Sequence, residues 1–264
     1  MTLPLLIAVA AAYLGASLLY LRLFLAGGEA GEAAARRTLA AGFLLHTASF
    51  VLLHVWAVRE GIAVQESVSF MAYAIVGLWL VFQHRWRAKV LGAVLAPLAF
   101  LLVFYATLPL GPGASDTGLR SFWSHFHILL SIGGFAFLAV AFAAGLTYLL
   151  QDRKLKGRKT ESIEQVVFRL PSLEVLDRMN SFCLLYGFPI LTLGMIMGGL
   201  WEWALGSGWG WDLKIQLSIA TWVFYLIVLL ARLVGHQRGR RVALLSVVGF
   251  VMLASSYIGG RALG

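Results

Sequence analysis

The side chains of this sequence that are best suited to binding a metal ion or haem iron are those of its six histidines: His46, His54, His84, His125, His127 and His236. An imidazole nitrogen can bind a metal ion and is also a common axial ligand of haem iron. A compact metal-ion site would need several carboxylates or histidines at one depth. The carboxylates expected near the outer surface are instead scattered along the chain: Glu60, Glu66, Asp116, Glu202 and Asp212. The pattern favours haem, which needs only one or two imidazoles.

A short loop, "GSGWGWDLK" at residues 206–214, could provide a flat wall for such a ligand. Trp209 and Trp211 offer planar indole faces, and their glycine neighbours allow the backbone to come close to a ligand. Asp212 can order the loop through its own hydrogen bonds. Arg120 and Lys214 are the cations available to pair with haem propionates. Trp123, Trp201 and Trp203 are typical of the aromatic belt at a membrane surface.

These residues are positioned by long apolar segments. The chain of 264 residues is 60% hydrophobic and only 12% charged, whereas about 25% of residues are charged in a soluble domain. Repeated apolar runs near 20 residues predict membrane-spanning helices. We predict a single all-α, polytopic membrane domain over residues 1–264, with about eight transmembrane helices at 3–25, 39–58, 67–83, 90–110, 123–150, 179–203, 215–235 and 242–260. The first run is too long for a signal-peptide core and is predicted to be a retained helix.

The distribution of lysine and arginine predicts the orientation of these helices. Of the 21 basic residues, seventeen fall on one set of loops and helix flanks, and four, Arg59, Arg120, Lys214 and Arg261, fall on the other. By the positive-inside rule both termini and the Trp-rich loop lie outside the cytoplasm. The net charge of +9 is thereby explained without a nucleic-acid partner. Residues 151–178 form the longest inner segment, predicted to be a basic, amphipathic loop on the membrane surface or the start of the next helix.

Depth distinguishes the histidines, at ~1.5 Å per helical residue. His127 and His54 lie ~6 Å from the outer boundary, and His46 lies ~10 Å from the inner one. Because ionisable residues inside a membrane are costly and usually functional, these three are the candidate axial ligands. His84 and His236 are predicted at the inner interface and His125 in solvent. The single cysteine, Cys183, excludes a disulfide framework and a CxxC thiol relay.

Several segments in a fixed order resemble one known family. "GSGWGWDLK" resembles the tryptophan-rich WWD loop of the cytochrome c assembly family, the group of CcsA/ResC, CcmC and HemX-type proteins. "LLHTASFVLLHVWAVREGIAVQESVSF" is similar to the family's second span and the loop after it. "FHILLSIGGFAFLAVAFAAGLTYLLQDRKLK" is similar to its histidine-led helix, and "ATWVFYLIVLLARL" to the helix after the WWD loop. The eight-span layout is similar to small HemX- and YpjD-like members.

The resemblance implies an outer haem b site formed by His127, Trp209, Trp211 and Asp212, with His46 as the family's buried histidine. It also implies a second ligand for each site, which this chain lacks at the matching positions. Its C-terminal "YIGGRALG" has no histidine, and Leu230 stands at the position of the other buried ligand. Independently of the resemblance, His54 could be the second axial ligand beside His127, because both lie at a similar depth. A complete haem-attachment activity is therefore not expected, and the chain is predicted not to be an enzyme by itself.

Three functions remain open at this point. The first is a haem-binding protein of cytochrome c assembly in the bacterial cytoplasmic membrane, with other maturation proteins as partners. The second is a HemX-like regulator or scaffold that recruits a cytoplasmic tetrapyrrole enzyme through residues 151–178. The third is an efflux-associated protein for an ion or small solute, which would favour buried carboxylates or broken helices. The segments "IGGF" and "MIMGGL" are candidate weak points in helices or packing sites.

Overall fold

The described part of the fold is built from long helices. The computed structural model describes residues 3–26, 31–56, 64–86, 88–108, 122–156, 171–204, 213–235 and 237–262. Some side chains at helix ends, including those of His54 and Lys214, also lie outside the description. Within the described ranges every regular element is helical, and seven helices are long and apolar enough to cross a membrane. The predicted all-α, polytopic class is confirmed.

One long helix, α2 (Glu32–Trp56), is not among those seven. Its first turns contain Glu32, Arg36 and Arg37, so the described part of the helix has a lower mean hydropathy than its neighbours. The acidic residue in the first turn interacts favourably with the helix dipole. Glu32 also accepts a hydrogen bond from Lys89 Nζ at 2.8 Å. This end of α2 is therefore suited to the membrane surface rather than to hydrocarbon.

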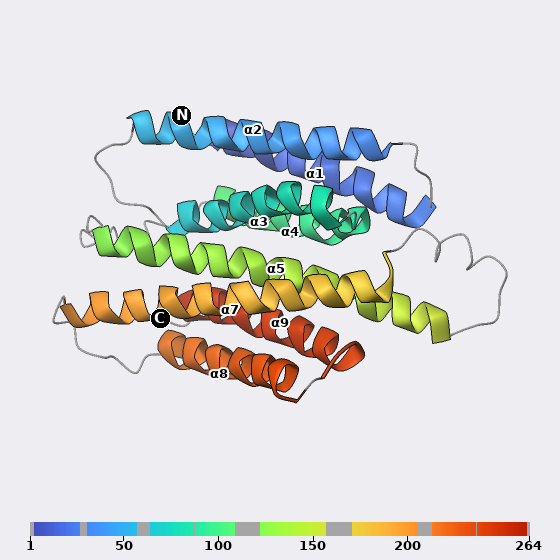
Figure 1. Ribbon diagram of the computed structural model, residues 1–264. Coiled ribbons are helices and arrows are strands. Elements are labelled where there is room, and N and C mark those ends of the chain that lie inside the picture. The colour runs from blue at the N-terminus through green and yellow to red at the C-terminus, as the bar shows by residue number, and fades with distance from the viewer. Residues whose placement is uncertain are drawn as a thin grey trace. The chain divides into compact units, whose positions relative to one another are not determined.

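The described helices form two compact units. The first contains α1 (Leu3–Ala26), α2, α3 (Val64–Trp86) and α4 (Gly92–Thr107), and a short 3-10 helix, η1 (Lys89–Leu91), precedes α4. The α1 helix packs against α2 and α4, and α3 packs against α4 and α2 (Figure 1). Because apolar side chains alone give little specificity between helices in lipid, small residues and polar pairs fix such contacts. The first unit accordingly encloses a polar cluster around His46.

The second unit contains α5 (Phe122–Lys156), α7 (Leu173–Ala204), α8 (Leu213–Leu233) and α9 (Arg240–Ala262). The α5 helix packs along α7 and against α9, and α8 packs against α9 and α7 (Figure 1). The longest helices, α5 and α7, exceed the ~20 residues needed to cross hydrocarbon. The last turn of α5 carries basic residues, among them Lys154 and Lys156. Cations there complement the dipole at a helix C-terminus.

Most predicted spans coincide with these helices, and the main differences are at the ends. The α2 and α7 helices begin at Glu32 and Leu173, earlier than predicted at 39 and 179. Ser172 caps α7 by accepting a hydrogen bond from Val175 N at 3.3 Å. Part of the predicted inner segment 151–178 is thus helix, as the second interpretation of that segment expected. Its central residues, 157–170, lie outside the described residues.

Candidate functional site

The contact between α5 and α7 is a seam with heptad-like spacing. On α5 it contains positions spaced by four, three and four residues: His127, Ser131, Gly134 and Leu138. On α7 the same spacing selects Gly187, Leu191, Gly194 and Gly198. This period keeps one helix face against its neighbour in a left-handed pair, and small residues let the two backbones approach closely. The segments "IGGF" and "MIMGGL" are therefore packing sites.

Glycine is required at these positions because the partner helix fills the space of a side chain. A Cβ atom at Gly134 would lie 2.7 Å from the backbone nitrogen of Leu191, and one at Gly194 would lie 2.9 Å from that of Ser131. At the outermost position of the seam, a Cβ on Gly198 would lie 2.7 Å from both Nδ1 and Cε1 of His127. Gly198 therefore leaves room for the imidazole.

The backbone of α7 fixes the tautomer of His127. Its Nδ1 lies 2.7 Å from the carbonyl oxygen of Gly194. Because a carbonyl oxygen can only accept, Nδ1 must carry the proton, and neutral imidazole then has its lone pair on Nε2. Metal-binding histidines commonly have this arrangement, in which a backbone carbonyl orients the ring and makes the other nitrogen a better ligand. Within the described part of the chain no hydrogen bond to Nε2 is present.

The seam also places His127 within two turns of the end of α7 that precedes the predicted WWD loop. The imidazole packs against Gly198, six residues before α7 ends at Ala204, which corresponds to ~9 Å along the helix. The loop leaves from Ala204 and returns to α8 at Leu213. Trp209, Trp211, Asp212 and Arg120 lie outside the described residues, as does the Lys214 side chain. Their predicted roles remain predictions based on the sequence.

His46 has a different environment, although it was also predicted to be an axial ligand. It is 0% exposed, and both ring nitrogens have partners. The hydroxyl of Tyr13 lies 3.1 Å from Nδ1, and Oγ of Ser69 lies 2.8 Å from Nε2. The ring of Phe50 stacks on it at 4.7 Å, and Tyr73 makes an edge contact at 5.5 Å. As an axial ligand, His46 would have to give up one of these two hydrogen bonds, because iron would take the place of the hydroxyl group at that nitrogen. The residues present thus fit haem ligation at His127 better than at His46.

The other predicted ligands are not brought together with His127 by the described contacts. His54 belongs to α2 in the first unit, with its side chain outside the description, whereas His127 belongs to the second unit. The proposed pairing of these two histidines stays a prediction. Leu230, at the position where the family resemblance implies a second buried histidine, is 49% exposed. Its side chain is therefore on the surface of the second unit.

Sequence reasoning missed the residues that support the two histidines. Gly194 and Gly198 support His127, and Tyr13 and Ser69 bond His46. The first pair carries a signal that could have been found, because "GMIMG" is a GxxxG motif in an apolar segment. Tyr13 and Ser69 are separated from His46 by 33 and 23 residues, and no local pattern marks them.

Comparisons with known proteins agree on one family. The family described as "Cytochrome C assembly protein" matches residues 61–264, a stretch that contains His127 and the Trp-rich loop and begins after His46. The cytochrome c biogenesis protein CcsA of Microcystis aeruginosa is 26% identical over 247 residues, covering 75% of each chain. CcsA of Synechococcus sp. strain CC9902 is 30% identical over 223 residues, covering 75% of this chain and 73% of the relative. CcsA of Guillardia theta is 26% identical over 217 residues.

Proposed function

The chain belongs to the cytochrome c assembly protein family, and on that premise we propose that it binds haem at its outer membrane surface through His127. The observation that carries this proposal is the 2.7 Å hydrogen bond from Nδ1 to the Gly194 carbonyl. It orients the imidazole with the Nε2 lone pair available to iron. Haem would supply a redox-active iron whose properties depend on its axial ligands.

In this proposal the protein holds and passes on haem for cytochrome c maturation and does not attach it covalently by itself. Attachment requires haem to be held and presented to the thiols of an apoprotein, and this chain lacks the second histidine of each family ligand pair at the matching positions. Trp209 and Trp211 would cover the porphyrin face, while Arg120 and Lys214 would pair with its propionates. The partners are other maturation proteins, and the location is the bacterial cytoplasmic membrane. The similarity to CcsA proteins of cytochrome c biogenesis supports a role in that pathway.

The test is titration of detergent-purified protein with haemin, read from the Soret band. Replacement of His127 by glycine should remove the axial ligand and leave a space of imidazole size in the seam. We expect haemin affinity to fall by at least about tenfold and the Soret band to shift. Added imidazole should restore the wild-type spectrum, which a merely misfolded variant would not show.

Two histidine variants serve as matched controls. His125 is exposed and lies two residues from His127, so His125→Ala should leave haemin binding unchanged. His46→Gln should also keep the Soret band, because that residue is assigned here to packing. The proposal fails if His127→Gly binds haemin with an unchanged affinity and spectrum, or if imidazole has no effect on the variant.

A further inference from the structure

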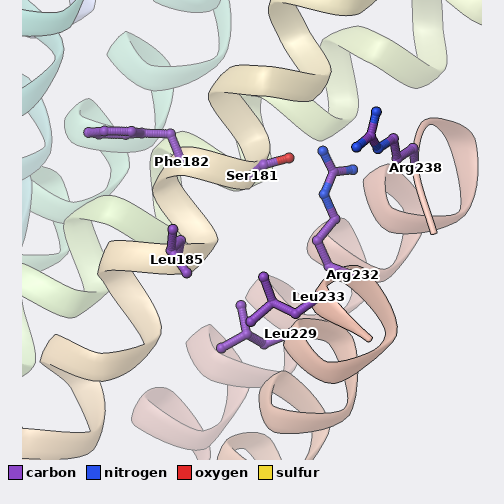
Figure 2. A pocket seen from close by; sticks show the side chains of 7 residues that line it. All are labelled: Ser181, Phe182, Leu185, Leu229, Arg232, Leu233 and Arg238. Carbon is purple, nitrogen blue, oxygen red and sulfur yellow. The ribbon is translucent and has the colours of Figure 1, made fainter. Parts of the chain in front are cut away.

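A second candidate site lies in the same unit, far from His127 along α7. A cavity of about 280 Å³ is lined by residues of α7, α8 and the turn before α9. Figure 2 shows the guanidinium groups of Arg232 and Arg238 at one end of it, close to the hydroxyl of Ser181. Leu185, Leu229 and Leu233 line the other end. The cavity is therefore cationic at one end and apolar at the other.

The cationic end is held in place by an ion pair. Arg232 donates from Nη1 and Nη2 to the two carboxylate oxygens of Asp177 at 2.9 and 2.8 Å. The same carboxylate accepts the backbone N–H of Gly239 at 2.8 Å, which fixes the turn next to Arg238. Gly239 has φ of +73°, a conformation that glycine adopts without strain. Two guanidinium groups face one carboxylate here, so the local charge remains positive.

The apolar end is open to the surroundings of the helices. Leu185 is 44% exposed and Leu233 is 51% exposed, and in a membrane protein such side chains contact lipid chains. The positive-inside rule assigns Arg232 and Arg238 to the cytoplasmic surface. Basic pockets between transmembrane helices at that surface bind anionic lipid headgroups. Charge, polarity and depth thus all match an amphiphile with an anionic head.

We propose that this cavity binds an anionic phospholipid of the inner leaflet, with its phosphate between Arg232 and Arg238 and an acyl chain along Leu229 and Leu233. The remaining N–H groups of Arg232 and all those of the exposed Arg238 are suited to phosphate oxygens. The volume of about 280 Å³ is just below the range of about 300–1,000 Å³ for pockets that enclose a whole small ligand. It accommodates a headgroup and the first part of a chain, while the rest of the lipid stays in the bilayer.

The test is native mass spectrometry of the detergent-purified protein with added phosphatidylglycerol or phosphatidylcholine. Wild type should retain phosphatidylglycerol in preference to phosphatidylcholine, and Arg238→Gln should weaken phosphatidylglycerol binding about tenfold. Arg37→Gln is the matched control, because Arg37 is an exposed arginine on the predicted inner side but belongs to the first unit. It should bind phosphatidylglycerol as wild type does. Equal retention of the two lipids, or unchanged binding by Arg238→Gln, would overturn the proposal.

A second variant separates a lipid from a free phosphate. Leu229→Trp fills the apolar end and leaves both arginines in place, so it should lose phosphatidylglycerol. Inorganic phosphate at millimolar concentration should not displace the lipid from wild type. If phosphate displaces it and Leu229→Trp binds normally, the site is one for a free anion and the lipid assignment is wrong. Haemin titration of Arg238→Gln should match wild type, because the two sites are at opposite ends of α7.

Discussion

The two best histidine candidates show how hydrogen bonding decides what an imidazole can do. His127 has one nitrogen fixed by a backbone carbonyl, which leaves the other as a potential ligand. His46 has a hydroxyl group at each nitrogen, the ring of Phe50 stacked on it and Tyr73 in an edge contact. Tyr13, His46 and Ser69 belong to α1, α2 and α3, so this chain of hydrogen bonds connects three helices. The same residue type is thus available for ligation in one unit and used for packing in the other.

The role assigned to His46 predicts a loss of stability without a loss of haemin binding. Hydrogen bonds within membrane proteins contribute only about 0.6 kcal/mol each on average, so His46→Gln should cost about 1 kcal/mol. His46→Ala also creates a cavity, for which a large-to-small change typically costs 2–5 kcal/mol, so we expect about 3 kcal/mol. Unfolding by SDS titration, followed by tryptophan fluorescence, measures both. A folded His46→Ala protein that no longer binds haemin would show that His46 is a ligand.

A second prediction at this scale compares the ion pairs of two acidic residues of α7, one made with α8 and one within α7. The Asp177–Arg232 pair has side chains only 16% and 13% exposed, whereas Glu174 and Arg178 are 72% and 69% exposed. Removing Arg232 leaves a largely buried carboxylate without its main partner, so Arg232→Ala should cost about 2 kcal/mol. Arg178→Ala should cost less than about 0.5 kcal/mol, since exposed helical pairs contribute little. Unfolding free energies of the two variants, measured under the same conditions, check the difference. Similar losses of unfolding free energy would mean that the Asp177–Arg232 pair stabilises the protein no more than an exposed helical pair does.

At the scale of helices, the contact between α5 and α7 involves two adjacent glycines, Gly133 and Gly134, of which only the second has no room for a side chain. Alanine is a better helix former than glycine by about 1 kcal/mol, so replacement should stabilise a helix wherever there is room. A Cβ at Gly133 would lie 3.5 Å from Cγ2 of Ile190, an ordinary contact. A Cβ at Gly134 would lie 2.7 Å from the backbone nitrogen of Leu191 and 2.8 Å from its Cα, and backbone atoms cannot move aside as a side chain can.

The pair therefore predicts opposite effects from one chemical change. Gly133→Ala should be neutral or stabilise the protein by up to about 1 kcal/mol. Gly134→Ala should destabilise it by about 1–2 kcal/mol, because overpacking against backbone atoms at the upper part of the usual range of about 1–3 kcal/mol exceeds the gain of about 1 kcal/mol in helix propensity. The unfolding midpoints of the two variants in detergent provide the measurement. Equal midpoints would mean that α5 and α7 are not packed as closely as the seam requires.

The helices were predictable because a bilayer leaves the backbone few alternatives. Unpaired N–H and C=O groups are costly in hydrocarbon, so an apolar run of sufficient length becomes a helix. The ends were less predictable, because helices continue past the apolar region into the surface layer. The α2 helix shows this, since it starts at Glu32 among charged residues. Hydropathy locates the middle of a span, whereas capping and dipole interactions decide where the helix ends.

The candidate site was predictable only in part, for a related reason. His127 was identified from its type and depth. The GxxxG motif on α7 could have identified the two glycines against which its imidazole packs. The distinction between His127 and His46 could not be predicted, because it depends on contacts between helices that are distant in sequence. Tyr13, for example, lies 33 residues from the imidazole to which it bonds. Depth in the membrane indicates that a histidine is functional or structural. The side chains and backbone groups around it decide whether it can bind a ligand or only hydrogen-bonds to other helices.

At the scale of the whole molecule, the direction of insertion connects the two proposed sites. The positive-inside rule places the ends of α7 and α8 near the Trp-rich loop outside and the turn between α8 and α9 inside. His127 would then meet haem on the outer side, and Arg238 would meet lipid of the inner leaflet. Both proposals depend on this orientation, which rests on seventeen basic residues against four.

Cysteine labelling can test that direction, because the native thiol is hidden. Cys183 is 0% exposed, so wild-type protein in intact spheroplasts should not react with a membrane-impermeant maleimide. Trp203, at the predicted outer end of α7, is 73% exposed, and Val234, after α8, is 74% exposed. Trp203→Cys should be labelled in intact spheroplasts, whereas Val234→Cys should be labelled only after the membrane is opened. The reverse pattern would place His127 on the cytoplasmic side of the membrane. The proposal that this histidine binds haem at the outer surface would then be wrong.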